Sequence, residues 1–241
     1  VTPIGFKAEP PSWAMGALSF LRPAKEVPTT WWSAADPMTT SPPARTLVIL
    51  IIGLWIFGTG DAILIAAEIG NTPWTVLAQG ISLNIGWTVG RATFLVSVLV
   101  LLLWIPLREK PGIGTILNAI FIAAAIEVMV PRLPTPESQA TAIAQVLLGV
   151  LMIGIGSGIY LTANLGPGPR DGWMTGLQKV SGIPIARVRG AIEVTVLLVG
   201  WQVLGGEFGV GTILFAVLIG PVVAICLNLA GRFGSSGEVH G

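Results

Sequence analysis

The sequence predicts an all-α membrane protein with six transmembrane helices, arranged as two inverted three-helix repeats that each carry a short re-entrant or interfacial helix. Three observations favour this fold class. Of the 241 residues, 53% are hydrophobic and only 10% are charged, whereas soluble domains carry about 25% charged residues. The apolar residues form long runs, which is typical of helices in a bilayer. Glycine, proline and arginine motifs of the first half also recur in register in the second.

Six apolar runs predict the spans. A helix needs roughly 20 residues to cross the hydrocarbon core, with ~17 as the lower limit, and the second and fifth runs are both close to that limit. The runs occupy residues 46–67, 92–107, 112–130, 141–163, 188–204 and 210–230.

A short amphipathic segment follows the first span of each half. In residues 73–85 the apolar side chains keep a one-faced helical spacing through Trp74, Leu77 and Ile81, and in residues 171–181 through Trp173 and Leu177. Both segments are too short to cross a bilayer. Each is therefore expected to be either a re-entrant half-helix or a helix lying at the membrane surface.

The matching motifs predict an internal duplication. Gly58-Thr59-Gly60 is repeated as Gly154-Ile155-Gly156, and the register continues unbroken to Arg91 and Arg187. One inserted residue later, 112–117 (Gly-Ile-Gly-Thr-Ile-Leu) is repeated as 209–214 (Gly-Val-Gly-Thr-Ile-Leu). Chance similarity between apolar segments would match Leu and Val, but not Gly, Pro and Arg in register.

The distribution of Lys and Arg predicts that both termini are cytoplasmic. With six spans and an inside N-terminus, the outside holds only Arg91 and Arg132. The inside holds Lys7, Arg22, Lys25, Arg45, Arg108, Lys110, Arg170, Lys179, Arg187, Arg189 and Arg232. Three crossings is an odd number, so the second repeat is expected to be inverted relative to the first. Inverted repeats are common in secondary transporters.

Residues 1–43 differ in composition from the rest. They are rich in Pro, Ser, Thr and Trp and hold no run long enough to span, which predicts a disordered or surface-lying cytoplasmic tail. Residues 1–37 are expected to pack little against the core. Alternatively, Met38 is the true start and residues 38–45 form a short leader before the first span. The remaining boundaries are repeat 1 at 44–133, repeat 2 at 138–231 and a cytoplasmic C-terminal tail at 232–241.

Composition also excludes several classes of site. The formal charge of +1 and the lack of a basic stripe give no case for nucleic acid. Cys226 is the only cysteine and His240 the only histidine, so a cysteine- or histidine-based metal site is not expected. No cofactor motif is present, and we expect neither a cofactor nor an enzyme.

The repeated motifs resemble the YczE/YitT-like family of bacterial membrane proteins. Residues 68–80, which begin Glu-Ile-Gly-Asn-Thr-Pro-Trp, are similar to its Leu-Gly-x-x-Pro-Trp-Asp-x-Leu signature, as are residues 163–172, and residues 211–221 are similar to the YczE-like branch. The resemblance covers about residues 46–230 and departs at Thr75, where the family usually has Asp. It implies a multipass protein of the bacterial cytoplasmic (inner) membrane, and no established substrate.

Four charged residues near the outer half of repeat 1 are candidates for a binding site. Asp61 lies inside the first span, ~9 Å from its end; a charge near the bilayer centre costs ~2.5–3.5 kcal/mol on insertion scales, so it normally faces protein or water. Glu68 lies two turns further along, Glu127 near the outer end of the third span, and Arg91 at the start of the second. One hypothesis is an ion-binding or proton-relaying site, and the other is a structural ion-pair cluster. Separately, Arg189 and Glu193 have the spacing of a structural helical ion pair.

The two turn motifs, Gly70 to Pro73 and Gly166 to Pro169, complete the candidate set. Proline is suited to the first turn of a helix, and a helix N-terminus with free N–H groups favours anions. Asn164, Arg170 and Asp171 belong to the second copy, and Arg170 makes it the better anion candidate. The simpler interpretation is turn chemistry alone.

Two functions remain open from the sequence. The first is a permease for a small polar or ionic solute, based on the inverted repeats, the interrupted segments and the acids inside spans. The second is a non-transporting scaffold or accessory subunit, based on the many Gly packing positions. The expected partners are the lipid bilayer, a small solute, and further copies of the chain or a membrane complex. A polar cavity between the halves would favour the permease, and a dry interface the scaffold.

Overall fold

The computed structural model describes residues 27–234, and within this range the chain is helical and has no β-strand. In chain order its elements are α2 Ala44–Ala67, α3 Pro73–Ile85, α4 Val89–Leu102, α5 Trp104–Leu107, α6 Ile113–Met129, the 3-10 turn η1 Val130–Arg132, α7 Gln139–Thr162, α8 Pro169–Ser181, α9 Ile185–Leu198, the π-helical turn η2 Val199–Val203, and α10 Val210–Gly231.

Five segments of the described range are long and apolar enough to cross a membrane: α2, α4 with α5, α6 with η1, α7, and α10. They agree with five of the six predicted spans. The other, predicted at 188–204, corresponds to α9 and η2. Helix α9 with η2 is not apolar enough by the same criterion of length and composition, because it carries three charged residues, Arg187, Arg189 and Glu193.

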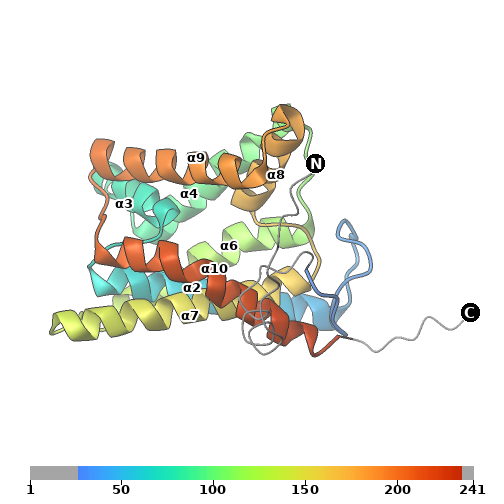
Figure 1. Cartoon of the computed structure of the whole chain (residues 1–241), viewed down its shortest axis with the longest axis horizontal. Coiled ribbons are helices and arrows are strands. Elements are labelled where there is room, and N and C mark those ends of the chain that lie inside the picture. Colours follow the sequence, from blue (N-terminus) through green and yellow to red (C-terminus); the bar gives the residue numbers. More distant parts are fainter. Residues whose placement is uncertain (1–26, 235–241) are drawn as a thin grey trace, which may run out of the picture.

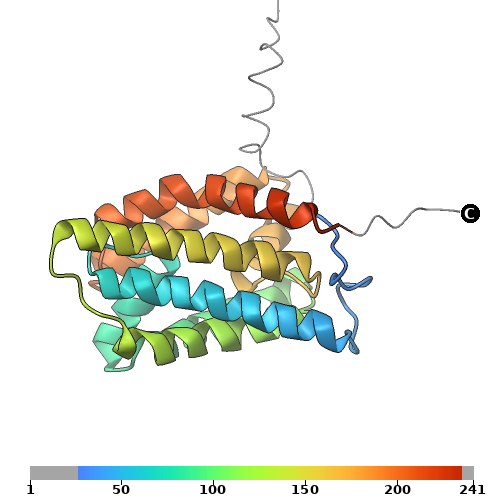
Figure 2. The ribbon, with the colours of Figure 1, turned by 90° about the horizontal axis from the view of Figure 1, so that it is seen from below.

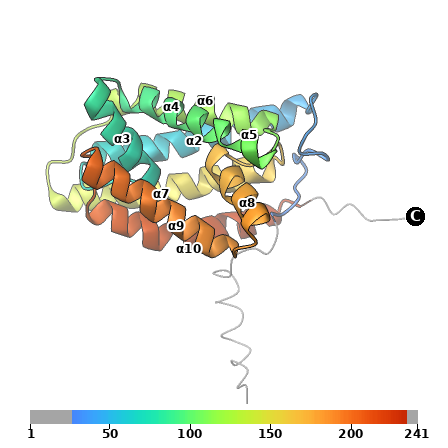
Figure 3. The ribbon, with the colours of Figure 1, turned by 90° about the horizontal axis from the view of Figure 1, so that it is seen from above.

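The helices form two layers. Figure 2 shows α10, α7, α2 and α6 side by side in that order, and α10–α7, α7–α2 and α2–α6 are packed pairs. The second layer holds α3, α4, α5, α8 and α9 (Figures 1 and 3). Its core is an apolar cluster that includes Trp74, Val96, Met174 and Ile192. Helix α4 packs against α6 of the first layer, whereas α9 does not pack closely against α10.

The central pair, α2 and α7, is antiparallel and held close by glycines. A Cβ added at Gly60 would lie 2.7 Å from the carbonyl oxygen of Gly149, and one added at Gly156 would lie 2.7 Å from that of Gly53. Real Cβ atoms essentially never approach another atom so closely. The glycines therefore let the two backbones approach, as small residues commonly do between membrane helices.

Each half of the chain binds a loop of the other half. The Gly114 N–H donates a hydrogen bond to the Leu165 carbonyl, and the Gly211 N–H donates one to the Ile69 carbonyl, both at 2.7 Å. The loop glycines Gly70 and Gly166 have φ of 112° and 101°, a region that a residue with a Cβ rarely adopts. The start of α6 thus packs on the loop before α8, and the start of α10 packs on the loop before α3.

Short breaks in the helices follow from proline and from the caps. Helix α4 ends at Leu102 and α5 begins at Trp104, because Pro106 has no N–H to continue the hydrogen-bond ladder. Pro73 and Pro169 occupy the first turns of α3 and α8, as predicted. Helix α3 has the bounds expected from its sequence, and α8 begins two residues earlier than expected.

Part of the N-terminal segment packs against the helices, which differs from the prediction. Trp32 is 8% exposed, and its indole N–H donates to the Thr162 hydroxyl at 3.1 Å. The Ala34 N–H donates to the Ala163 carbonyl, and the Asn164 amide donates to the Ala34 carbonyl. The expectation that residues 1–37 pack little is therefore wrong for residues 27–37, because buried tryptophan and backbone pairing outweigh their polar composition. Residues 1–26 and 235–241 lie outside the described residues.

Candidate functional site

The candidate site is a cavity of about 650 Å³ between the two layers. Its wall combines aromatic and apolar side chains with charged ones from both halves. Helices α2, α3, α4, α6, α7, α8, α9 and α10 all contribute to it. The charged lining residues are Asp61, Arg170, Asp171, Arg189 and Glu193, and the uncharged polar ones include Ser97, Asn118, Ser157 and Tyr160.

The first turns of α3 and α8 meet at this cavity. The Arg170 guanidinium lies over the Trp74 ring, 5.1 Å from its centroid, and the Trp74 and Trp173 rings meet edge to face. Trp74 and Arg170 occupy equivalent positions in the two repeated motifs. Helix α3 has a side-chain cap, since the Thr72 hydroxyl accepts from the Thr75 N–H, whereas the N-cap residue of α8 is Gly168, which has no side chain to accept one. The free N–H groups at the start of α8 therefore add a positive field beside Arg170.

Asp61 is buried beside the first turn of α3, with one oxygen unpartnered. Its side chain is 1% exposed. The Thr75 hydroxyl donates to Oδ1 at 3.4 Å, and Oδ2 is buried without a hydrogen-bond partner. Arg170 interacts electrostatically with this carboxylate. A buried oxygen of this kind costs free energy, so it indicates a site that is complete only when something else binds.

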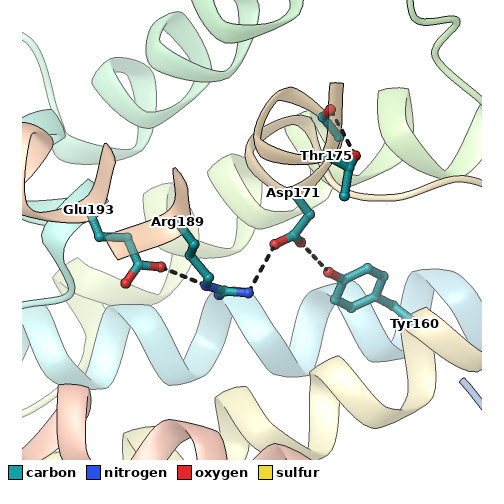
Figure 4. Close-up of polar contacts among 6 residues, drawn as sticks. Tyr160, Asp171, Thr175, Arg189 and Glu193 are labelled. Carbon is teal, nitrogen blue, oxygen red and sulfur yellow. Dashed lines mark hydrogen bonds and ion pairs between the residues drawn. The ribbon is translucent and has the colours of Figure 1, made fainter. Parts of the chain in front are cut away.

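A connected row of polar side chains lines the part of the cavity next to α9. The Tyr160 hydroxyl donates to Asp171 at 3.2 Å, Asp171 pairs with Arg189 at 3.7 Å, and Arg189 pairs with Glu193 at 3.0 Å (Figure 4). The predicted ion pair between Arg189 and Glu193 is thus confirmed. The Arg189 side chain is 57% exposed, so this row is not buried within the protein.

Arg170 differs from Arg189 in having no such partner. Within residues 27–234 its guanidinium makes no hydrogen bond and no ion pair; it lies over the Trp74 ring and interacts electrostatically with nearby acids, Asp61 first among them. Arg170 and Asp61 are therefore two charged groups in one cavity whose hydrogen-bonding capacity is largely unused.

The structure does not bring the other predicted residues to this cavity. Arg91 pairs with Glu127 at 3.8 Å, and both line a separate hollow of about 600 Å³ on the outer side of α4 and α6. Glu68 is exposed at the C-terminal end of α2. Asn164 holds the N-terminal segment through Ala34. The electrostatic partner of Asp61 is Arg170, not Arg91 as the sequence suggested.

The four residues of the turn motifs set the positions of α3 and α8 at the cavity and contribute no charged group to it. Gly70 and Gly166 provide the left-handed turns before the two half-helices, and Pro73 and Pro169 line the cavity at their first turns. The indole N–H of Trp104 donates to the Pro169 carbonyl at 2.9 Å, which fixes the start of α8.

Sequence reasoning missed two of the polar lining residues, Tyr160 and Asn118. Tyr160 is the only tyrosine of the chain and lies in an apolar span, which was a usable signal. Asn118 lies next to the α8 turn, 3.3 Å from a Cβ added at Gly168. In residues 27–234 no three His, Cys, Asp or Glu side chains gather closely enough to hold a metal ion.

Comparison with known proteins places this architecture in a family. A family profile described as "Family of unknown function (DUF6198)" matches residues 44–228. An "Uncharacterized protein" of Haemophilus influenzae is 40% identical over 206 residues, covering 86% of this chain and 93% of the relative. The "Uncharacterized membrane protein YczE" of Bacillus subtilis is 33% identical over 182 residues, covering 75% and 81%.

A more distant relative, the "Uncharacterized protein YyaS" of Bacillus subtilis, is 25% identical over 185 residues, covering 75% of this chain and 92% of the relative. No solved structure matches the chain significantly. The profile covers most of the described helices, and YczE is the kind of relative that the repeated motifs predicted. The chain is a multipass helical membrane protein that belongs to the DUF6198 family and is YczE-like.

Proposed function

We propose that the protein is a permease of the bacterial inner membrane that moves a small polar or ionic solute through the cavity between its two layers. The observation that carries the proposal is Asp61 Oδ2, buried without a partner in a cavity that also holds Arg170. Ionisable residues inside membrane proteins commonly mark substrate or ion pathways. A scaffold would instead be expected to have a dry interface between its halves.

The proposal includes six crossings and inverted repeats. The antiparallel pairing of α2 and α7 supports it, as do the matched hydrogen bonds from Gly114 and Gly211 to the opposite half. In this scheme α9 and η2 are the remaining crossing. Arg189 and Glu193 of α9 line the cavity, which explains how a span can carry them. Both termini are then cytoplasmic, in accord with the distribution of Lys and Arg.

A difference between the halves suggests how access to the cavity alternates. Helices α4 and α6 are packed tightly, since a Cβ at Gly90 would lie 2.8 Å from the Glu127 backbone nitrogen. The equivalent helices α9 and α10 do not pack closely, and residues of both line the cavity. Inverted-repeat transporters alternate by rocking one repeat against the other. In the second state, α9 and α10 would close while α4 and α6 separate.

The substitution Asp61→Asn tests the functional role of the unpartnered carboxylate. The purified variant should fold and keep its melting temperature, because Asp61 makes only one long hydrogen bond in the empty site. Neutralising it also removes a cost of ~2.5–3.5 kcal/mol for a charge in the membrane. Stabilisation by a bound solute, found by a thermal-shift screen of amines, amino acids, carboxylates and sugars, should be lost.

Glu127→Gln is the matched control, since it neutralises another acid in a span that lies outside the cavity. This variant should keep the response to solute. A clear drop in the melting temperature of Asp61→Asn would contradict the functional role, because it would show that the carboxylate chiefly balances Arg170. Truncating one partner of a buried ion pair typically costs ~3–5 kcal/mol.

A further inference from the structure

We infer that the solute is a small zwitterion, of the amino-acid or betaine type, whose cationic group binds Asp61 and whose anionic group binds Arg170 and the start of α8. This inference rests on the proposed function and names its substrate class. It is based on which charged groups of the cavity are already paired and which are not.

The charges next to α9 are satisfied within the protein. Arg189 contacts both Asp171 and Glu193, and Asp171 also accepts a hydrogen bond from Tyr160. These groups have little need of a ligand. Asp61 and Arg170 remain: Asp61 has a buried oxygen with no partner, and Arg170 has no ion pair or hydrogen bond within residues 27–234.

A ligand with a single charge satisfies only one of these two groups. A cation next to the Asp61 carboxylate would have the Arg170 guanidinium close by, and these two groups interact electrostatically. An anion at Arg170 would be close to the Asp61 carboxylate. A zwitterion gives each protein group an opposite charge, so both desolvated charges are paired, which is the condition under which buried charges are tolerated.

The environments of the two ends fit this assignment. The N–H groups at the start of α8 have no side-chain cap and favour an anion beside Arg170. Bidentate binding of a carboxylate is characteristic of arginine. Aromatic rings of Phe57 and Tyr160 also line the cavity, and such rings favour ammonium groups. At about 650 Å³ the cavity is large enough for a solute of this size.

The two halves also differ in charge at the positions that the inference uses. Asp61 of repeat 1 corresponds to Ser157 in repeat 2, and Arg170 of repeat 2 corresponds to Trp74 in repeat 1. Repeat 1 therefore supplies the acid and repeat 2 the base. A dipolar solute matches a cavity that holds one unpaired acid and one unpaired base.

The test measures binding of matched probes to the purified full chain. L-Alanine and glycine betaine carry both charges, ethylammonium carries only the cation, and propionate carries only the anion. We expect the zwitterions to raise the melting temperature, with both single-charge probes binding about 10- to 100-fold more weakly, as expected when one of the two contacts between opposite charges is lost.

Two substitutions make the test sharper. Asp61→Asn should weaken zwitterion binding about 10- to 100-fold and bring propionate to a comparable affinity, because only the positive wall remains. Arg170→Gln should do the same for ethylammonium. Glu127→Gln, which alters the separate outer hollow, should leave all probe affinities unchanged and controls for general effects of lost charge.

The possible failures are distinguishable from a failure of the proposed function. If ethylammonium or propionate binds the unaltered protein as tightly as the zwitterions, the zwitterion inference is overturned while a solute site in the cavity remains. If neither zwitterion changes the melting temperature, the inference is also overturned, and binding of any other solute in the wider screen would still support the permease. Loss of all binding on Glu127→Gln would move the site to the outer hollow and contradict both proposals.

Discussion

The matched hydrogen bonds between the halves make a prediction that can be worked out from distances. Replacing Gly114 or Gly211 by alanine places a Cβ against a backbone carbonyl of the opposite loop. That Cβ would lie 2.7 Å from the Leu165 oxygen in the first case and 2.4 Å from the Gly70 oxygen in the second. Ordinary contact begins at 3.4 Å, so the carbonyl must move by 0.7 Å (3.4 − 2.7) or 1.0 Å (3.4 − 2.4).

At Gly114 the displaced Leu165 carbonyl is itself the acceptor of the glycine's hydrogen bond. At Gly211 the displaced Gly70 carbonyl follows directly after the accepting Ile69 carbonyl, so in both cases the hydrogen bond breaks or lengthens. Loss of one hydrogen bond costs about 0.5–1.5 kcal/mol and overpacking about 1–3 kcal/mol. The better helix propensity of alanine offsets about 1 kcal/mol. Each substitution should therefore destabilise by about 1–3 kcal/mol, which for a chain of this length lowers the melting temperature by about 2–4 °C for every kcal/mol.

The assay is thermal unfolding of the purified variants in one detergent, with Gly190→Ala as the matched control. No atom lies within 4 Å of a Cβ added at Gly190 in α9, so this variant should be as stable as the unaltered protein or more stable, by up to about 1 kcal/mol. The reasoning is refuted if Gly114→Ala and Gly211→Ala melt like the control. A loss in only one of the two would show that the halves do not bind each other equivalently.

Two further predictions concern regions outside the cavity. Burial raises the pKa of Glu207 above its ordinary value of 4.5. The hydrogen bond from the Gln79 amide opposes this rise, and the negative charge of Glu68 adds to it. The stability of the folded protein should therefore fall as pH rises from 4.5 through the raised pKa. In melting curves at several pH values, Glu207→Gln should have the melting temperature of the unaltered protein below pH 4.5 and a higher one above the raised pKa of Glu207. A difference in melting temperature that is the same at every pH would contradict the raised pKa. Trp32→Ala should lower the stability by about 3–5 kcal/mol, as for other buried tryptophans. The substitution removes a side chain packed at the end of α7 and its hydrogen bond to Thr162. An unchanged melting temperature would show that residues 27–37 are not integral to the fold.

Much of the helix arrangement could be predicted because its causes are local in sequence. Apolar runs of sufficient length fix the long helices, and proline at a first turn fixes the starts of α3 and α8. The spacing of Arg189 and Glu193 was enough to predict their ion pair, since both lie on one face of one helix. The spacing of charges along one helix could not reveal that α9 also lines the cavity, because the cavity is open there only where α10 does not pack closely against α9.

The composition of the site was harder to predict, because it depends on which half-helix meets which span. Asp61 was identified from its depth, but its position near Arg170 follows from the meeting of α3 and α8, which are distant in sequence. Glu127 and Arg91 were grouped with Asp61 by their expected depth, and they instead pair with each other on the outer side of α4 and α6. Depth in the membrane is readable from a sequence, whereas rotation about the helix axis requires the neighbours to be known.

The loops of each half that accept hydrogen bonds from the other half also affect how the chain folds during synthesis. When residues 44–133 have entered the membrane, the Gly114 N–H lacks the Leu165 carbonyl, and the Ile69 carbonyl lacks the Gly211 N–H. A backbone group left unsatisfied in lipid costs several kcal/mol. The first half is therefore incompletely hydrogen-bonded until the second half has been synthesised. The two halves produced as separate chains should each be unstable alone and should assemble when they are produced together.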